Sequence, residues 1–139
     1  MNRNSLSGLS VLITRPAAQA YSLRRAIESA GATVLSLPLI EIKALVDQRE
    51  IRDLKDKVLQ LDSYQALIFV SNNAVHYGAE IINNFWPQFP VDIDVIAVGP
   101  TTAEAAREQL ACTVFQPENG MTSEDILRLP VLQDVAGKK

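Results

Sequence analysis

The chain alternates short runs of apolar residues with longer segments in which apolar residues recur every three or four positions. The short runs lie at residues 9–13, 33–37, 66–70, 93–99 and 113–117. The longer segments lie at residues 16–31, 47–64, 73–85 and 100–111, with a last one from Thr122 that Pro130 interrupts. Continuous runs of this length favour strands, and the three-to-four-residue period favours amphipathic helices. A repeated strand–helix order predicts an α/β fold with a parallel sheet and right-handed crossovers.

Two of the apolar runs carry more detailed expectations. Pro38 lies inside the second run, so we expect a strand to about Leu37, a change of direction, and a second short extended piece to Ile42. The run at residues 66–70 is short and continuous, as in a strand that is buried on both faces.

Composition excludes several classes of protein. An apolar fraction of 47% and a charged fraction of 21% are typical of a globular protein. A net charge of −3 predicts no general attraction to nucleic acid or to an anionic membrane. The lone Cys112 excludes an intrachain disulfide and no metal-ligand spacing occurs, so we expect no metal and a buried thiol. With no signal-peptide pattern and no apolar run of membrane-spanning length, a cytoplasmic location is the default expectation.

Three strands are predicted to end in the same way, on small polar residues or glycine that lead into a helix. Thr14 and Arg15 follow the first strand, Ser71 and Asn72 follow the third, and Thr101 and Thr102 come soon after Gly99. Ligands of parallel sheets bind at the carboxyl ends of the strands, where helix N-termini offer unpaired N–H groups. Three such turns along one sheet indicate an anion-binding edge, whereas the simpler alternative is that each turn only caps its helix.

Single residues add little catalytic chemistry. Arg15 suits a carboxylate or phosphate, or else pairs with a neighbouring acid on the surface. His76 is expected to have an ordinary helix-surface or packing role. No nucleophile has an adjacent base, and neither glycine-rich phosphate-binding motif is present, which argues against a nucleotide-binding protein.

Four stretches in order resemble the uroporphyrinogen-III synthase family: "VLITRPAAQAYSLRRAIESAGATVLSLPLIEI", "LIFVSNNAVHYG", "IAVGPTTAEAARE" and "MTSEDILRLPVLQDVAGKK". The resemblance implies two flavodoxin-like three-layer α/β sandwich domains with a substrate cleft between them. It implies a synthase that closes the linear tetrapyrrole hydroxymethylbilane with loss of water and inversion of the last ring. It also implies a full-length monomer that uses no cofactor. The substrate carries carboxylates, which suit a cleft bordered by helix N-termini and an arginine.

The resemblance also implies which residues bind substrate. "TRP", "SNNAV", "VGPTTA" and "MTSEDIL" match motifs of the family, and no residue here matches its suspected tyrosine proton donor. The implied substrate-binding residues are Thr14, Arg15, Pro16, Ser71, Asn72, Asn73, Gly99, Thr101, Thr102 and Thr122.

Members of that family are longer than this chain. We therefore expect residues 1–37 to be an incomplete first domain, a strand–helix unit with its linker, and residues 38–139 to be a complete second domain. Such a chain is expected to lack normal synthase activity by itself and to self-associate through the apolar surface of the orphaned unit. The alternative is a non-catalytic flavodoxin-like module, or an inactive part of the synthase.

Overall fold

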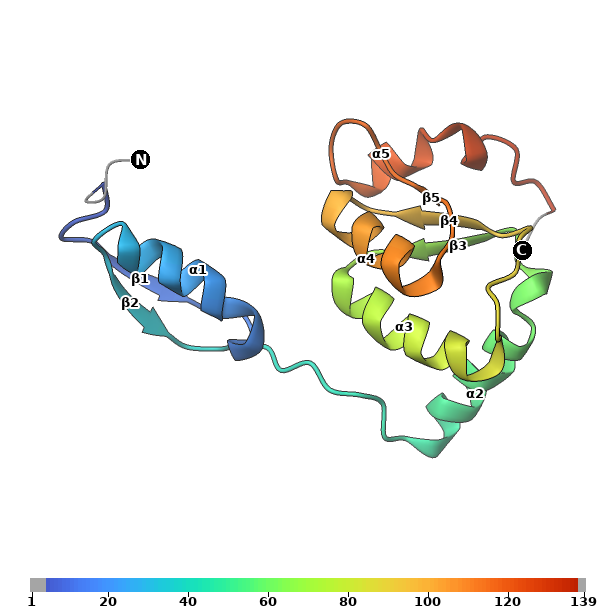
Figure 1. Ribbon diagram of the computed structural model, residues 1–139, viewed down its shortest axis with the longest axis horizontal. Coiled ribbons are helices and arrows are strands. Elements are labelled where there is room, and N and C mark those ends of the chain that lie inside the picture. Colours follow the sequence, from blue (N-terminus) through green and yellow to red (C-terminus); the bar gives the residue numbers. More distant parts are fainter. Residues whose placement is uncertain (1–4, 138–139) are drawn as a thin grey trace. The chain divides into compact units, whose positions relative to one another are not determined.

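The structure is a computed structural model that describes residues 5–137 and divides the chain into two units (Figure 1). Unit 1 ends at Ala44 and unit 2 begins at Leu45. Each unit has its own parallel sheet, and the protein belongs to the α/β class that the strand–helix order predicted.

Unit 1 consists of strand β1 (Ser10–Ile13), helix α1 (Ala17–Ser29) and strand β2 (Thr33–Ser36). The two strands are parallel, with Ser10 opposite Thr33. Pro16 stands at the N-cap of α1, one position before the predicted first turn. Two strands and one helix bury only a few side chains, among them Ile13, Ala20 and Ala32. Leu12 and Leu35 remain 55% and 58% exposed.

The segment between the units has no regular structure. Strand β2 ends at Ser36, and residues 37–46 form neither helix nor strand, so the second extended piece expected to reach Ile42 does not become a strand. Pro38 lacks an N–H group and so weakens any pairing there. Leu39 and Ile40 are 68% and 64% exposed in this segment.

Unit 2 repeats the strand–helix order that the sequence predicted. Its elements are α2 (Gln48–Leu59), the short helix η1 (Leu61–Ser63), β3 (Ala66–Phe69), α3 (Asn72–Phe85), β4 (Asp94–Ala97), α4 (Pro100–Leu110), β5 (Val114–Phe115), α5 (Ser123–Leu127) and the short helix η2 (Pro130–Leu132). The sheet has the order β3-β4-β5, all parallel, with Ala66 opposite Asp94 and Val95 opposite Val114.

Unit 2 has three layers around its sheet. Helices α3 and α4 cover one face and α5 lies over the other (Figure 1). On the α3–α4 side, Val95 and Ala97 of β4 pack with Val75 and Ala103, all of them fully buried. On the α5 side, Ile96 is also fully buried. This arrangement is consistent with the predicted flavodoxin-like fold.

Two expectations about the sheet were wrong. β3 is an edge strand rather than a strand buried on both faces, and Ile68 and Val70 are 44% and 66% exposed. The three strand-end turns also do not follow one sheet, because β1 pairs with β2 and not with β3, β4 or β5. Apolar runs identify strands but carry no information about which strands become neighbours.

Candidate functional site

The helix that follows β3 is capped by its own chain. Ser71, the N-cap of α3, has an extended backbone, and its Oγ accepts a hydrogen bond from the N–H of Ala74 at 3.1 Å. A side-chain N-cap of this kind stabilises a helix by about 1 kcal/mol relative to alanine at the same position. The capping interpretation therefore holds for Ser71, whose hydroxyl proton is still available for a second hydrogen bond.

The helix that follows β4 starts without a side-chain cap. Gly99 is the N-cap of α4, has no side chain to offer, and is buried. The first N–H inside the helical ladder is that of Ala103, which donates to the Gly99 carbonyl at 2.9 Å. Pro100, which lies in the first turn, has no N–H. The N–H groups of Thr101 and Thr102 also lie in that turn, so they have no acceptor within the helix. These two groups carry the partial positive charge of the α4 N-terminus.

A side-chain hydrogen bond connects the starts of α3 and α4. The Thr102 hydroxyl, on a residue that is only 4% exposed, donates to Oδ1 of Asn72 at 3.0 Å. This bond fixes the exposed Asn72 amide beside the uncapped end of α4. Its Nδ2 group then remains a donor that an acceptor from solvent or a ligand can use.

The loop before α5 closes one side of this region. The Met121 side chain lies against Gly99, where an added Cβ would be 3.2 Å from its Cγ and Sδ atoms. Because any larger residue would displace Met121, the glycine permits this close approach. The turn after β4 and the loop before α5 are therefore neighbours.

Thr122 belongs to a capping box. Its hydroxyl donates to Asp125 Oδ2 at 2.7 Å, its backbone N–H donates to the same oxygen at 3.0 Å, and the Asp125 N–H donates back to its Oγ1. These hydrogen bonds, first that from the Thr122 hydroxyl, lower the pKa of Asp125 below its ordinary value. A carboxylate beside Thr122 opposes the approach of an anion at this position.

The remaining predicted residues lie in unit 1. Thr14 and Arg15 are exposed in the turn between β1 and α1, and Pro16 is half-buried. Nη2 of Arg15 donates to Oε1 of Gln19 at 3.5 Å. The ion pairs among residues 5–137 do not include Arg15, so its expected pairing with a neighbouring surface acid is not observed there. Thr14, Arg15 and Pro16 therefore belong to unit 1. The other predicted residues lie in unit 2, where the two turns and the loop before α5 are neighbours: Ser71, Asn72, Asn73, Gly99, Thr101, Thr102 and Thr122.

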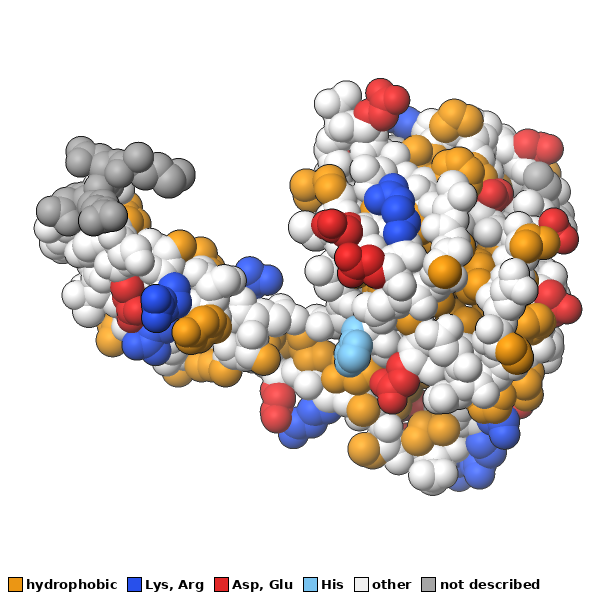
Figure 2. All heavy atoms as spheres, in the orientation of Figure 1, with side chains coloured by type: hydrophobic (Ala, Val, Ile, Leu, Met, Phe, Trp, Pro, Cys, Tyr) orange, Lys and Arg blue, Asp and Glu red, His pale blue; other side chains and the backbone are white. Residues whose placement is uncertain are grey.

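Charge is sparse around the two joined turns. Neither residues 70–73 nor residues 98–103 include a lysine or arginine. Figure 2 shows acidic and basic side chains scattered over the visible face of unit 2 rather than gathered in one patch. The partial positive charge at this edge therefore comes from the N-termini of α3 and α4.

Gln116, the residue after β5, was not among the predicted site residues. Its Oε1 is buried and has no hydrogen-bond partner among the described residues. A buried amide oxygen without a partner costs free energy and is uncommon in folded proteins. Gln116 lies at the carboxyl end of β5. The residues around it in the sequence show no pattern that predicts a site.

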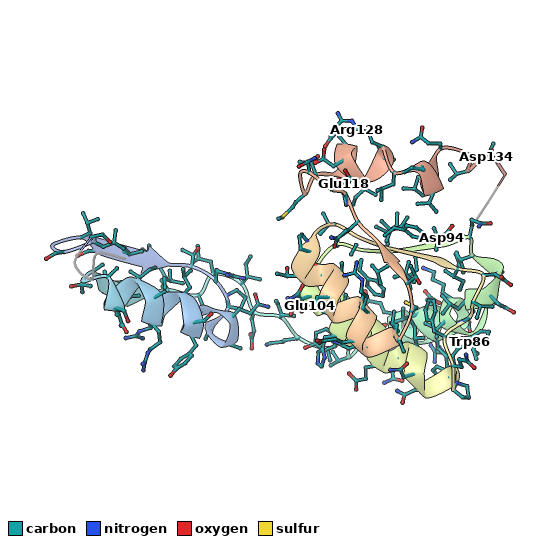
Figure 3. The ribbon with its side chains drawn as sticks, turned by 45° about the horizontal axis from the view of Figure 1, so that its top comes forward. Trp86, Asp94, Glu104, Glu118, Arg128 and Asp134 are labelled. Atoms are coloured by element: carbon teal, nitrogen blue, oxygen red, sulfur yellow. The ribbon has the colours of Figure 1, made fainter. Side chains whose placement is uncertain are left out.

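Other chemically notable features lie elsewhere. A hollow of about 670 Å³, lined by Asp94, Cys112 and Thr113 among others, is at the opposite end of the sheet, where β4 starts. Asp94, at the start of β4, is labelled in Figure 3. Burial raises the pKa of the half-buried Cys112 thiol, which keeps it protonated and unreactive at neutral pH. His76 is exposed and stacks edge-on with Tyr77, in agreement with the surface role expected for it.

Within residues 5–137, no group of histidine, cysteine and acidic side chains has the arrangement of a metal site. None of the helices described in that range combines the length and apolar character needed to cross a membrane.

Comparison with known proteins places these observations in a family. The family model described as uroporphyrinogen-III synthase HemD matches residues 22–139. The uroporphyrinogen-III synthase of Proteus mirabilis is 34% identical over 94% of this chain and 64% of its own length. Those of Salmonella typhimurium and Escherichia coli are 31% and 29% identical, again over 94% of this chain, and 52% of their own length. The chain thus spans between about half and two thirds of the relatives it matches, and it belongs to the uroporphyrinogen-III synthase family.

Proposed function

We propose that this chain provides one wall of the substrate cleft of a uroporphyrinogen-III synthase acting in tetrapyrrole biosynthesis. The substrate is the linear tetrapyrrole hydroxymethylbilane, which loses water as the ring closes with inversion of its last pyrrole. Membership of the family supports the reaction. The observation that carries the assignment to this edge is the hydrogen bond that holds Asn72 beside the uncapped start of α4.

The donors at this edge suit the carboxylates of such a substrate. Nδ2 of Asn72, the hydroxyl of Ser71 and the first N–H groups of α4 can each donate to a carboxylate oxygen. Helix N-termini favour anions without requiring a cationic side chain, which fits the sparse charge here. In this proposal, Asn73, Gly99 and Thr101 shape the two turns, Thr102 positions Asn72, and Thr122 holds the loop of Met121 through its cap.

The role proposed for this wall is positioning. A reactive linear substrate needs its two ends held close together and its leaving hydroxide stabilised, and neither task requires a nucleophile. Arg15, flanked by Thr14 and Pro16, is the cationic candidate from unit 1 for a further carboxylate. The chain is proposed to work in the cytoplasm without a metal or organic cofactor.

The test uses the isomer composition of the product. Hydroxymethylbilane is incubated with the chain alone, and with the chain plus the part of the Proteus mirabilis relative that lies outside the matched region. We expect the chain alone to give only isomer I at the spontaneous rate, and the combination to give isomer III. A combination that binds but yields only isomer I would contradict the proposal and would favour the non-catalytic module.

Two asparagines on α3 provide a matched pair for this assay. Asn72→Ala removes a donor at the proposed wall, and Asn83→Ala removes the amide that donates to the Gln109 carbonyl near the other end of the helix. A hydrogen bond to a charged group contributes about 1.5–3 kcal/mol, so we expect Asn72→Ala to lower the rate of isomer III formation roughly 10- to 100-fold. Asn83→Ala should change it less than about twofold, and equal losses in both would refute the role of Asn72.

Unit 1 is the proposed route to self-association of the chain. Its Leu12 and Leu35 are exposed on a two-stranded sheet that buries only a small core. We expect sedimentation to show mass that rises with concentration, and Leu12→Lys together with Leu35→Lys to abolish the rise. A compact monomer at all concentrations would contradict this expectation.

A further inference from the structure

The hollow of about 670 Å³ lies at the end of the unit 2 sheet opposite to the candidate site. It is formed where α3 and α4 end and where β4 and β5 begin, so the same two helices run from the candidate site to the hollow. Pockets that bind small molecules commonly have volumes of about 300–1,000 Å³. The hollow is therefore large enough for a small organic molecule.

Asp94 gives the hollow its charge. Among the described residues that line it, Asp94 is the only one with a charged side chain. Its carboxylate is partly buried at the start of β4 (Figure 3), and the ion pairs within residues 5–137 do not include it. The Cys112 thiol also lines the hollow and stays neutral, because burial raises its pKa. A carboxylate that has lost part of its water and has no basic partner favours a cationic ligand.

The ends of two helices add to this negative potential. Asn83 lies in the last turn of α3, and Gln109 and Leu110 are the last two residues of α4. Carbonyl groups in the last turn of a helix lack a donor within the helix and carry a partial negative charge. The Asn83 amide donates to one of them, the Gln109 carbonyl, at 3.4 Å, which links the two helix ends. Because the N-termini of the same helices lie at the candidate site, the two ends of unit 2 suit ligands of opposite charge.

An aromatic surface lies next to Asp94. Ile96 is opposite Phe115 in the parallel ladder, and Asp94 is two residues before Ile96. Side chains two residues apart in a strand project from the same face, so Asp94 and Phe115 share one face of the sheet on adjacent strands. Phe115 is 40% exposed, and Phe89 and Leu110 add further apolar surface to the lining. Aromatic rings attract cations to their faces and also pack against flat apolar groups.

We propose that the hollow binds a small organic cation, in which an ammonium group is joined to an aromatic or other flat apolar body. The ammonium group lies at Asp94 and the helix ends, where carboxylate and carbonyl oxygens replace its water. The apolar body lies against Phe115 and Phe89 and removes apolar surface from water. The inference does not rest on the proposed function, because no residue of the candidate site lines the hollow.

Other classes of ligand fit the hollow less well. A metal ion needs several ligands, and the described part of the chain holds no group of three histidine, cysteine or acidic side chains arranged to supply them. An anion would meet the like charge of Asp94 and of two helix ends. The substrate of the proposed function carries carboxylates, so the hollow is not a second site for that molecule.

Three probes that share a phenyl ring and differ in their end groups test the proposal. At neutral pH phenethylamine is a cation, 2-phenylethanol is uncharged and phenylacetate is an anion. Each is titrated into the 139-residue chain, and binding is followed through the amide NMR signals. Hydrogen bonds between charged groups are stronger than neutral ones, so we expect phenethylamine to bind roughly tenfold more tightly than the alcohol. The signals that shift should belong to residues 87–94 and 109–115, and phenylacetate should not shift them.

Two aspartates provide a matched pair of variants. Asp94→Asn removes the charge of the hollow and keeps the size of the side chain, whereas Asp92→Asn removes an exposed charge that does not line it. Asp94→Asn should weaken the binding of phenethylamine roughly tenfold, to the level of the alcohol. Asp92→Asn changes the net charge by the same amount and should alter binding less than about twofold. Both variants should bind 2-phenylethanol as the unmodified chain does, which shows that the hollow is intact.

Four results would overturn the proposal. Equal binding of the three probes would show an apolar surface that does not select for charge. Equal weakening by Asp94→Asn and Asp92→Asn would show attraction to the net charge of the chain and not to the hollow. Shifts confined to signals outside the hollow, or no binding of phenethylamine, would show that the hollow is not a site for organic cations.

Discussion

At the scale of single residues, the hydroxyl of Thr102 is the contact that joins the two strand-end turns. It is buried and donates to Asn72, so Thr102→Val should destabilise the folded chain by about 1 kcal/mol through the lost hydrogen bond. Thr101→Val alters an exposed neighbour in the same helix turn and should stay within about 0.5 kcal/mol. Urea denaturation of both variants measures the difference, and equal effects would mean that the bond contributes nothing.

Gly120 is a second residue whose substitution has a calculable consequence. Its φ is +86°, and an added Cβ would collide with the Asp125 carboxylate. We therefore expect Gly120→Ala to break the capping box and to cost about 1–3 kcal/mol, the range for strained backbone positions. Gly137 also has positive φ but meets no atom within 4 Å of an added Cβ, so Gly137→Ala is the control that lacks the collision. Thermal unfolding distinguishes them, and a Gly120 variant as stable as the control would contradict the argument.

Sequence reasoning succeeded at this scale where the physics is local. The sequence pattern predicted a helical segment from Thr122, and Thr122 is the N-cap of α5, because such a helix start depends on the spacing of a few neighbouring residues. The hydrogen bond from Thr102 to Asn72 spans thirty positions and had no local signal. The unpartnered oxygen of Gln116 likewise depends on what packs over it, which no pattern records.

At the scale of elements, the cap of α5 gives the chain a pH dependence. The Thr122 hydroxyl lowers the pKa of Asp125 in the folded state, so the folded chain binds this proton less readily than the unfolded chain. The stabilisation is complete above the ordinary pKa of aspartate and is lost as the pH falls through the lowered folded value. Unfolding free energies measured from pH 6 to pH 2 should fall less for Asp125→Asn than for the unmodified chain. Parallel curves would show that the cap does not titrate with folding.

Strand assignments show the limit of prediction for elements. Each apolar run after residue 60 became a strand close to its expected bounds, because β-branched runs between helix periods leave little ambiguity. The burial of β3 was misjudged because burial depends on the number of strands beside it. Equally, the turn after β1 was assigned to the wrong sheet, since neighbouring strands in space are chosen by long-range packing.

At the scale of the whole molecule, the two units differ in how well they can stand alone. The main core cluster runs from Val58 to Val114 and lies entirely in unit 2. Unit 1 has a two-stranded sheet with exposed leucines, and structures of that size are marginal in water. We expect residues 45–139 alone to keep the main thermal transition of the full chain, as measured by circular dichroism. A fall of more than about 10 °C in that transition would show that unit 1 supports the core.

The segment between the units should be the first point of proteolysis. Residues 37–46 have no helix or strand, and Lys43 is exposed, with only a surface ion pair to Glu41. Trypsin needs an extended, accessible backbone, so we expect its first cut after Lys43 rather than after Lys57, which lies within α2. Lys43→Gln should delay the first cut, while Lys57→Gln should not, with products followed by mass spectrometry. A first cut inside α2 would mean that the helix opens more readily than the connecting segment, and that unit 2 is not the more stable part of the chain.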